Sequence, residues 1–208
     1  MAASLTSTDL TLGNTSGASI PGTPLAGQTV LYPKDDKLLY YKDDAGVERS
    51  ANINLGTAVA TTSGTSIDFT GIPAGVKRVT VNFDNVSLSA TAAILIQLGD
   101  SGGVKTTAYE GNSQTLSSIT TTTSYASGFG LNTGGNAGNR HHGVVTLSLV
   151  NAATFVWASV GCVTLGNNTI SAATAGIVTL SAVINRVRIT STSTDTFDLG
   201  SVNISWEF

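Results

Sequence analysis

The C-terminal segment limits the fold more than any other part of the sequence. It contains two expected β-strands, 186–192 and 201–208, joined by a polar turn. In the second strand Val202, Ile204 and Trp206 alternate with polar residues, which is the period of a strand with one buried face. We therefore expect the chain to end inside a β-sheet.

The composition favours β-structure over helix. Of the 208 residues 41% are hydrophobic and only 11% are charged, against roughly a quarter charged in ordinary soluble domains. Thr and Val fit a pleated sheet, and Gly and Asn suit turns. The best helical candidate, residues 174–184, has the apolar period for one turn only. The chain is long enough to bury a core. The predicted fold class is all-β, an antiparallel jelly-roll-like β-sandwich head domain with a small N-terminal arm and a β-hairpin connector.

Turn residues and alternation divide the chain into four parts. We expect an N-terminal arm at 1–21, either extended or a partner-dependent strand, a connector β-hairpin module at 22–48, a linker or first strand at 49–64 and the β-sandwich head domain at 65–208. The strands expected in the connector are 29–32 and 38–42. The strands expected in the head are 66–69, 76–83, 92–98, 104–109, 124–131, 144–149, 155–163, 176–180, 186–192 and 201–208.

The connector carries more apolar surface than so short a hairpin can bury by itself. Three copies around an axis would cover this surface with closed symmetry. The residues expected to serve oligomerisation or attachment are Leu31, Tyr32, Leu38, Leu39, Tyr40 and Tyr41.

Charge and hydropathy argue against several classes of protein. The formal net charge is −3 with no block of like charges, so we expect neither nucleic-acid binding nor attraction to an anionic membrane. No apolar run approaches the ~18 residues of a membrane span, and we expect no membrane insertion. The N-terminus has neither the basic nor the apolar region of a signal peptide.

The chain contains one cysteine, which excludes an internal disulfide and a Cys-built metal site. Cys162 shares a strand face with Val156, Ala158 and Val160. We expect a buried, unreactive thiol.

Residues 99–103 read Gly-Asp-Ser-Gly-Gly, the pentapeptide around the nucleophilic serine of chymotrypsin-like proteases. That chemistry needs a histidine base and a buried aspartate, and in that family both precede the serine. Here His141 and His142 both follow Ser101. The interpretation is a glycine-rich turn between two strands, with no catalytic residue.

No metal site or cofactor is expected. Neighbouring residues of a strand point to opposite faces, so His141 and His142 of one chain are poorly placed to share an ion. One histidine from each of three subunits could bind an ion on a three-fold axis, and this alternative stays open. The pairs Asp35–Asp36 and Asp43–Asp44 lack the alternating oxygens of a calcium loop.

The longest segment without a pattern, residues 128–143, is the candidate recognition site. Long loops on a rigid β-scaffold often bind ligands, and Asn, Arg, His and aromatic side chains can hydrogen-bond to and stack on sugars. The alternative is a loop without a ligand. The candidate receptor-binding residues are Tyr125, Phe129, Asn132, Asn136, Asn139, Arg140, His141 and His142.

Three segments resemble one family of proteins. The C-terminal "TDTFDLGSVNISWEF" and "TSIDFTGIPAGVKRVTVNFDNVS" at 65–87 are similar to the C-terminal head domain of bacteriophage tail-fibre and related virion proteins. The segment "GTPLAGQTVLYPKDDKLLYYKDDAGVE" at 22–48 resembles a short connector that precedes the distal domains of tail-fibre proteins. Residues 88–175 carry no matching motif.

The resemblance implies a non-enzymatic virion protein, made in the cytoplasm of the bacterial host, that assembles as a homotrimer. Its N-terminal part would bind other virion proteins, and its head would bind a host cell-surface glycan or protein. A purely structural virion component, such as a head fibre or decoration protein, is the alternative. A carbohydrate-active enzyme or a protease would need an acid–base constellation, for which the sequence offers no candidate.

Overall fold

The computed structural model describes residues 21–34, 38–117, 120–132, 136–166 and 170–208. All regular secondary structure within these residues is β-strand. The described residues contain no helix long and apolar enough to cross a membrane. The expected all-β fold class is confirmed. The described chain divides into two compact units, one that ends at Asn54 and one that comprises Leu55–Glu207.

The first unit contains a three-stranded antiparallel sheet of β1 (Val30–Pro33), β2 (Leu39–Lys42) and β3 (Glu48–Ser50). The first two strands are the predicted hairpin, but β3 was not predicted because three residues are too few to show an alternating pattern. Charges hold β3 in place: Lys34 Nζ lies 2.6 Å from Glu48 Oε1, and Arg49 Nη1 lies 2.7 Å from Asp43 Oδ2. The connector is therefore a three-stranded module rather than a hairpin.

The second unit, the head, contains the remaining strands. They are β4 (Asn54–Leu55), β5 (Val59–Ala60), β6 (Ser66–Thr70), β7 (Arg78–Leu88), β8 (Ile94–Asp100), β9 (Gly103–Val104), β10 (Glu110–Leu116), β11 (Thr122–Tyr125), β12 (Phe129–Gly130), β13 (His141–Asn151), β14 (Val156–Leu165), β15 (Ile170–Thr179), β16 (Arg186–Ser191) and β17 (Phe197–Glu207).

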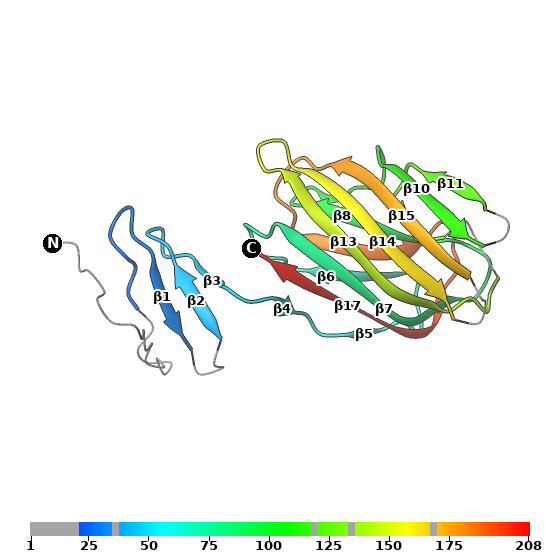
Figure 1. Ribbon diagram of the computed structural model, residues 1–208, viewed down its shortest axis with the longest axis horizontal. Helices are drawn as coiled ribbons and strands as arrows, with labels where there is room; N and C mark the ends of the chain where they lie inside the picture. The colour runs from blue at the N-terminus through cyan, green and yellow to red at the C-terminus, as the bar shows by residue number, and fades with distance from the viewer. Residues whose placement is uncertain (1–20, 35–37, 118–119, 133–135, 167–169) are drawn as a thin grey trace. The chain divides into compact units, whose positions relative to one another are not determined.

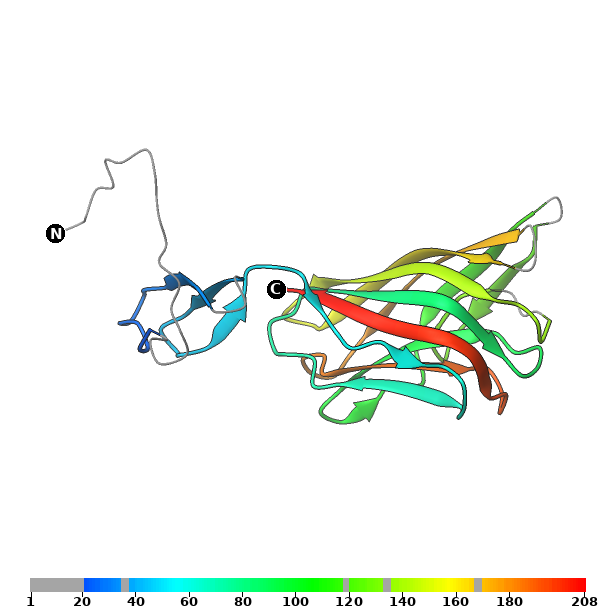
Figure 2. The same cartoon turned by 90° about the horizontal axis from the view of Figure 1, so that it is seen from below.

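The strands of the head form two sheets. The larger has the order β11-β10-β15-β14-β13-β7-β17-β4, with β5 also paired to β17. The smaller has the order β12-β8-β16-β6, with β9 paired to β8. Figures 1 and 2 show them as two layers that face each other, and the chain crosses between the layers from β6 to β7, from β7 to β8 and from β16 to β17. The expected antiparallel sandwich is thus the observed architecture.

The hydrophobic core lies between the two layers. Its largest fully buried side chains are Trp157, Phe129 and Phe197. In β17 Val202 and Ile204 face this core, as the alternation predicted. Burial of such side chains is the main favourable contribution to folding, at about 25 cal/mol for each Å² of apolar surface removed from water.

A bulge joins β17 to β7 where only glycine fits. The register between the two strands shifts on both sides of Leu199, and Gly200 has φ +91°. A Cβ on Gly200 would overlap the backbone of Asn85, itself at φ 59°. Because bulges bend the strand and increase its local twist, this one bends β17 near its start.

The boundary between the two units corrects the predicted division at residue 64. The segment 49–64 was expected to be a linker or a first strand, and the structure favours the second alternative, because the segment begins within β3 and continues into β4 and β5. Val59 pairs with Val202, and Ala60 with Ser201. A strand of two residues, such as β5, is too short to show an alternating pattern. It forms because it pairs with β17 and not because of its own β-propensity.

The strand expected at 104–109 is also wrong, because the strand of this region is β10, which starts at Glu110. Ala108 has φ 60° and breaks the extended chain before it. Tyr109 is buried, and its hydroxyl accepts from Leu98 N–H at 2.8 Å and donates to Lys105 O at 3.1 Å. The aromatic side chain that suggested a strand instead anchors a loop.

The thiol of Cys162 is exposed, which corrects the expectation of burial. The predicted grouping of Cys162 with Val160 on one strand face holds, but this face points away from the core. The inward positions of β14 are held by Trp157, Val163 and Leu165. Both faces of β14 carry apolar residues, so the alternating pattern of the sequence does not reveal which face points into the core.

Candidate functional site

One end of the head, called the proximal end below, holds both the start of the unit and the end of β17. Gly56 N–H donates to Ile204 O at 2.8 Å. In β7 Arg78 pairs with Glu207 on one side and with Ser148 on the other. The chain therefore enters the head beside the place where β17 ends.

The opposite end, called the distal end, holds the candidate recognition segment. There Leu88, the last residue of β7, pairs with Phe197, the first residue of β17. Val86 pairs with His141, the first residue of β13. The described residues 136–140 lead directly into β13 and so lie at this distal end (Figure 1).

Five of the eight candidate receptor-binding residues are buried, which corrects the expectation of a fully exposed set. Phe129 packs edge-on against Tyr109, with ring centroids 5.0 Å apart. The Tyr125 hydroxyl donates to the carbonyl oxygen of Asn132. These groups support the segment from inside and are not available to a receptor. The five residues, none more than 8% exposed, are Tyr125, Phe129, Asn132, Asn139 and His141.

Two glycines allow this segment to lie close against β8. Gly128 packs over Ile96 and Leu95, and a Cβ there would lie 3.1 Å from atoms of both residues. A Cβ on Gly130 would overlap the ring of Tyr125. This glycine placement makes the packed strand β12 possible, within the strand expected at 124–131.

Three of the candidates remain accessible. Asn136 and Arg140 are exposed, and His142 is half-buried. Asn139 N–H donates to Asn136 O at 2.9 Å, and Gly166 N–H donates to Arg140 O at 2.7 Å. We call Asn136, Arg140 and His142 the distal set. It lies on backbone that hydrogen bonds hold in place.

The two neighbouring histidines point to opposite sides of β13. His141 Nδ1 lies 3.0 Å from Val86 O, and a carbonyl can only accept, so Nδ1 carries the proton. Burial lowers the pKa of His141, although the bond to Val86 opposes this. Its Nε2 has no hydrogen-bond partner among the described residues.

On the other side, His142 Nδ1 accepts from Asn85 N–H at 3.2 Å, so this nitrogen is unprotonated. The 3.8 Å separation between His142 Nδ1 and Asp84 Oδ1 is therefore no ion pair in this state. Within the described part of the chain no group of three metal-binding side chains occurs.

The Gly-Asp-Ser-Gly-Gly segment forms the turn between β8 and β9. One oxygen of the Asp100 carboxylate accepts from Gly102 N–H at 2.8 Å, and the other from Ser181 N–H at 2.8 Å and Ala182 N–H at 3.0 Å. Burial acts to raise the pKa of Asp100, but these three donors outweigh it and lower the pKa. Asp100 thus ties two connections together, and Ser101 is an exposed turn residue.

Ser101 and the histidines lie at opposite ends of the sandwich. Asn185 N–H donates to Gly99 O at 3.0 Å, and Ile72 N–H donates to Asn185 O at 3.1 Å, which places this turn at the proximal end. His141 begins β13 at the distal end. Neither His141 nor His142 can serve Ser101 as a general base in this fold.

Two cavities lie in places that the sequence did not suggest. The larger, of about 480 Å³, is lined by Glu110, Asn112, Ser124 and Ile177 among others, and Ser124 Oγ donates to Asn112 Oδ1 at 2.6 Å. Glu110 pairs with Ile177. Across the sheet the same row of paired residues continues through Ala158, Ser148 and Arg78. It ends at Glu207, which lies at the proximal end. This cavity is therefore proximal.

The second cavity, of about 460 Å³, opens between β6 and the β4–β5 segment. Its apolar lining includes Leu55, Phe69, Ile204 and Trp206. Leu55 belongs to the segment expected to be a linker or a first strand, and no pattern in that segment predicts this cavity.

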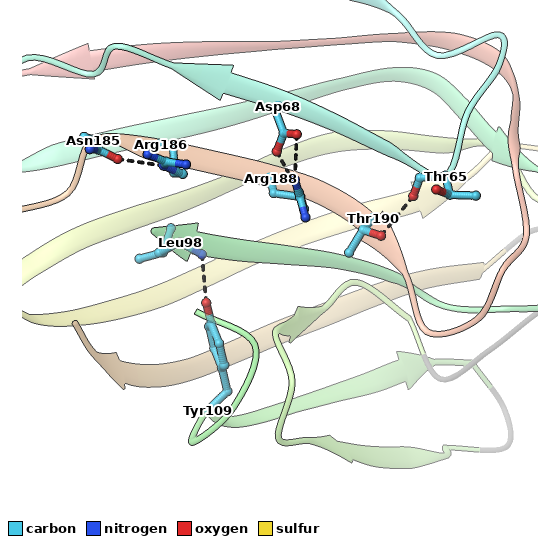
Figure 3. A network of polar contacts seen from close by, with 8 residues as sticks. All are labelled: Thr65, Asp68, Leu98, Tyr109, Asn185, Arg186, Arg188 and Thr190. Atoms are coloured by element: carbon cyan, nitrogen blue, oxygen red, sulfur yellow. Dashed lines mark hydrogen bonds and ion pairs between the residues drawn. The ribbon is translucent and has the colours of Figure 1, made fainter. Parts of the chain in front are cut away.

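The outer face of the smaller sheet is polar. Arg188 Nε and Nη2 donate to the two carboxylate oxygens of Asp68 at 2.7 and 2.8 Å, and Thr190 Oγ1 donates to Thr65 O at 2.9 Å. Figure 3 shows both contacts. Hydrogen bonding to Asp68 raises the pKa of Arg188. Arg186, on the same face of β16, instead donates from Nε to the neutral amide oxygen Oδ1 of Asn185 at 2.8 Å.

Comparison with known proteins adds no family. The chain matches no protein-family model, and it matches neither a curated protein nor a solved structure. The function is therefore inferred from the geometry above and from the segments that resemble tail-fibre proteins.

Proposed function

We propose that this protein is a non-enzymatic virion protein of the tail-fibre type, which binds the particle through its N-terminal part and a host receptor through the distal end of its head. The observation that carries the proposal is the arrangement of the ends. The chain enters the head at Gly56, beside Ile204 at the end of β17, so the loops before β13 face away from the attached side. A fibre head needs this separation of mount and contact surface.

The distal set is the proposed contact with a host cell-surface glycan or protein. Asn136, Arg140 and His142 supply an amide, a guanidinium and an imidazole, which can all hydrogen-bond to hydroxyl or carboxylate groups. A shallow site of this kind is weak in one copy. Three copies in a fibre, and several fibres on a particle, would supply the necessary avidity.

The connector is proposed to hold a homotrimer together. Leu31 and Leu38 are 46% and 38% exposed, and Leu39, Tyr40 and Tyr41 are half-buried. Tyr32 was expected to take part in oligomerisation, but it is buried within its own chain and its hydroxyl donates to Glu48. It is therefore not part of the proposed contact. Jelly-roll connectivity of the head belongs to the same proposal, supported by the crossovers between the two sheets.

Adsorption of virions tests the receptor site. Virions that carry Asn136→Ala, Arg140→Ala and His142→Ala together should adsorb to host cells at least about tenfold more slowly, because losing ~1.4 kcal/mol of contact energy is a tenfold loss of binding. The melting temperature should fall only slightly, because Asn136 and Arg140 are exposed and half-buried His142 gives up only the acceptor of one backbone N–H.

The matched control replaces three exposed residues of the proximal loop, Ser101, Thr106 and Thr107, with alanine. This variant should adsorb normally. If the distal variant also adsorbs normally, the distal set is not the receptor site.

A purely structural role is the second candidate, because β13, β14 and β15 carry an exposed apolar face that suits contact with other virion subunits. Val144 and Val160 of this face are 48% and 62% exposed. Labelled-particle microscopy would locate the protein on capsid or tail. A capsid position, together with unchanged adsorption of the distal variant, would favour this role.

A further inference from the structure

The outer face of β13, β14 and β15 carries no charge. The three strands contain no Asp, Glu, Lys or Arg. The most exposed apolar side chains of these strands are Val160 at 62%, Val150 at 61%, Val144 at 48% and Ile177 at 39%. Small polar side chains such as Thr146, Ser148 and Thr164 lie among them. A water-facing antiparallel sheet ordinarily carries polar residues on that face, and here the lack of ionic side chains is the feature that requires an explanation.

The registers place the apolar side chains of this face side by side. Val144 pairs with Cys162, and Cys162 with Ala173. In the next row with the same orientation, Val160 pairs with Ala175. The patch therefore runs across three strands without interruption by an ion.

The same face is hollowed beside Val160. A cavity of about 310 Å³ lies between β10 and β14, over the small residues Gly161, Ala173 and Ala175. Asn112 and Gln114 form its polar side. A protruding valine next to a hollow of small residues is a shape into which another apolar surface can interlock.

The size of the face agrees with a protein contact. Three strands of about ten residues cover roughly 500 Å² at about 3.3 Å per residue and about 4.8 Å between strands; β10 beside them is left out because its exposed Glu110 is charged. This area lies below the roughly 800 Å² that each partner gives to a standard-size interface and fits the smaller class of contacts.

We propose that this outer face is a contact surface between copies of this chain. A charged partner is disfavoured, because the face has no ionic side chain with which it could form an ion pair. A membrane surface is also disfavoured, because proteins normally bind membranes through Lys, Arg and aromatic side chains. A second copy brings an equally uncharged, small-residue face, so the contact leaves no charge buried without a partner. The proposal does not depend on receptor binding.

Cys162 reports directly on this contact. It is the one cysteine of the sequence, it lies in the centre of the face, and its thiol is exposed in the single chain. If copies cover the face, a maleimide should label the native full-length protein at micromolar concentration at least about tenfold more slowly than the urea-unfolded protein. Dilution should speed the labelling, because it separates the copies.

Val160→Lys places a charge in the contact and should restore rapid labelling of Cys162 together with a smaller native mass. Val183→Lys is the matched control, because Val183 is 45% exposed in the connection between β15 and β16, away from the face. This control should label as slowly as the unsubstituted protein.

Two results would overturn the proposal. One is rapid labelling of Cys162 in the unsubstituted protein at micromolar concentration. The other is slow labelling that neither dilution nor Val160→Lys accelerates, since the protection would then come from somewhere else. The dilution series involves no variant, so a folding defect in Val160→Lys would leave the test intact.

Discussion

His141 is a buried residue whose protonation opposes folding. Its pKa in the folded state is lowered, mainly by burial, whereas the unfolded chain titrates near the ordinary value of about 6.5. Above that value both states are neutral. Below it the unfolded chain takes up the proton first, so the free energy of unfolding should fall as the pH drops below about 6.5.

Urea unfolding at pH 7.5 and pH 5.5 measures this dependence. His141→Gln should lose about 1 kcal/mol of stability at pH 7.5 through altered packing, yet lose less than the unsubstituted protein on acidification. Equal losses in the His141 variant and the unsubstituted protein would contradict the prediction.

Asp100 and Ser101 are neighbours with opposite expected effects. Asp100→Ala removes the acceptor of three backbone N–H groups and should cost about 2–4 kcal/mol in urea unfolding. Ser101→Ala should change neither stability nor adsorption. Covalent labelling of Ser101 by a fluorophosphonate probe would show an activated serine and refute this interpretation.

At the scale of elements, β12 depends on the absence of a side chain at Gly130. Gly130→Ala would press a methyl group into the Tyr125 ring and should destabilise the head by about 1–3 kcal/mol. Gly111→Ala is the control in β10, because its Cβ would meet its nearest neighbour at an ordinary 3.5 Å. Thermal unfolding that ranks the two variants in the reverse order would be inconsistent with this packing.

The elements differ in how far the sequence predicts them. Strands such as β7, β16 and β17 alternate over six or more residues, and this alternation reveals them. By contrast, β10 reads Glu-Gly-Asn-Ser-Gln-Thr-Leu and is a strand because β11 and β15 pair with it on both sides. Pairing between distant segments leaves no local trace in the sequence.

The candidate site shows the same limit. Asn139 and His141 were interpreted as exposed because they are polar, but both are buried. For His141 the bond to Val86 O compensates the burial, and its partner lies 55 residues earlier in the chain. Only Asn136, Arg140 and His142 keep the expected accessibility.

At the scale of the whole molecule, the proposed homotrimer is tested by native mass. The mass at micromolar concentration should be three times the 21.1 kDa of one chain, or six times where two trimers meet through the outer face of β13, β14 and β15. Leu31→Ser together with Leu38→Ser should make this species dissociate at higher concentration, because both leucines are exposed in the connector. A single species with the mass of one chain would refute the trimer.

The closeness of the two ends of the head has a topological consequence. Gly56 lies against Ile204, so a short linker could join Glu207 to Leu55, while new termini open between Thr62 and Ser63, which are exposed. Every paired strand except β4, which loses Asn54, would remain intact in such a circular permutant. Its termini would emerge at the distal end, and a carrier fused there would hold the same sandwich in the reverse orientation.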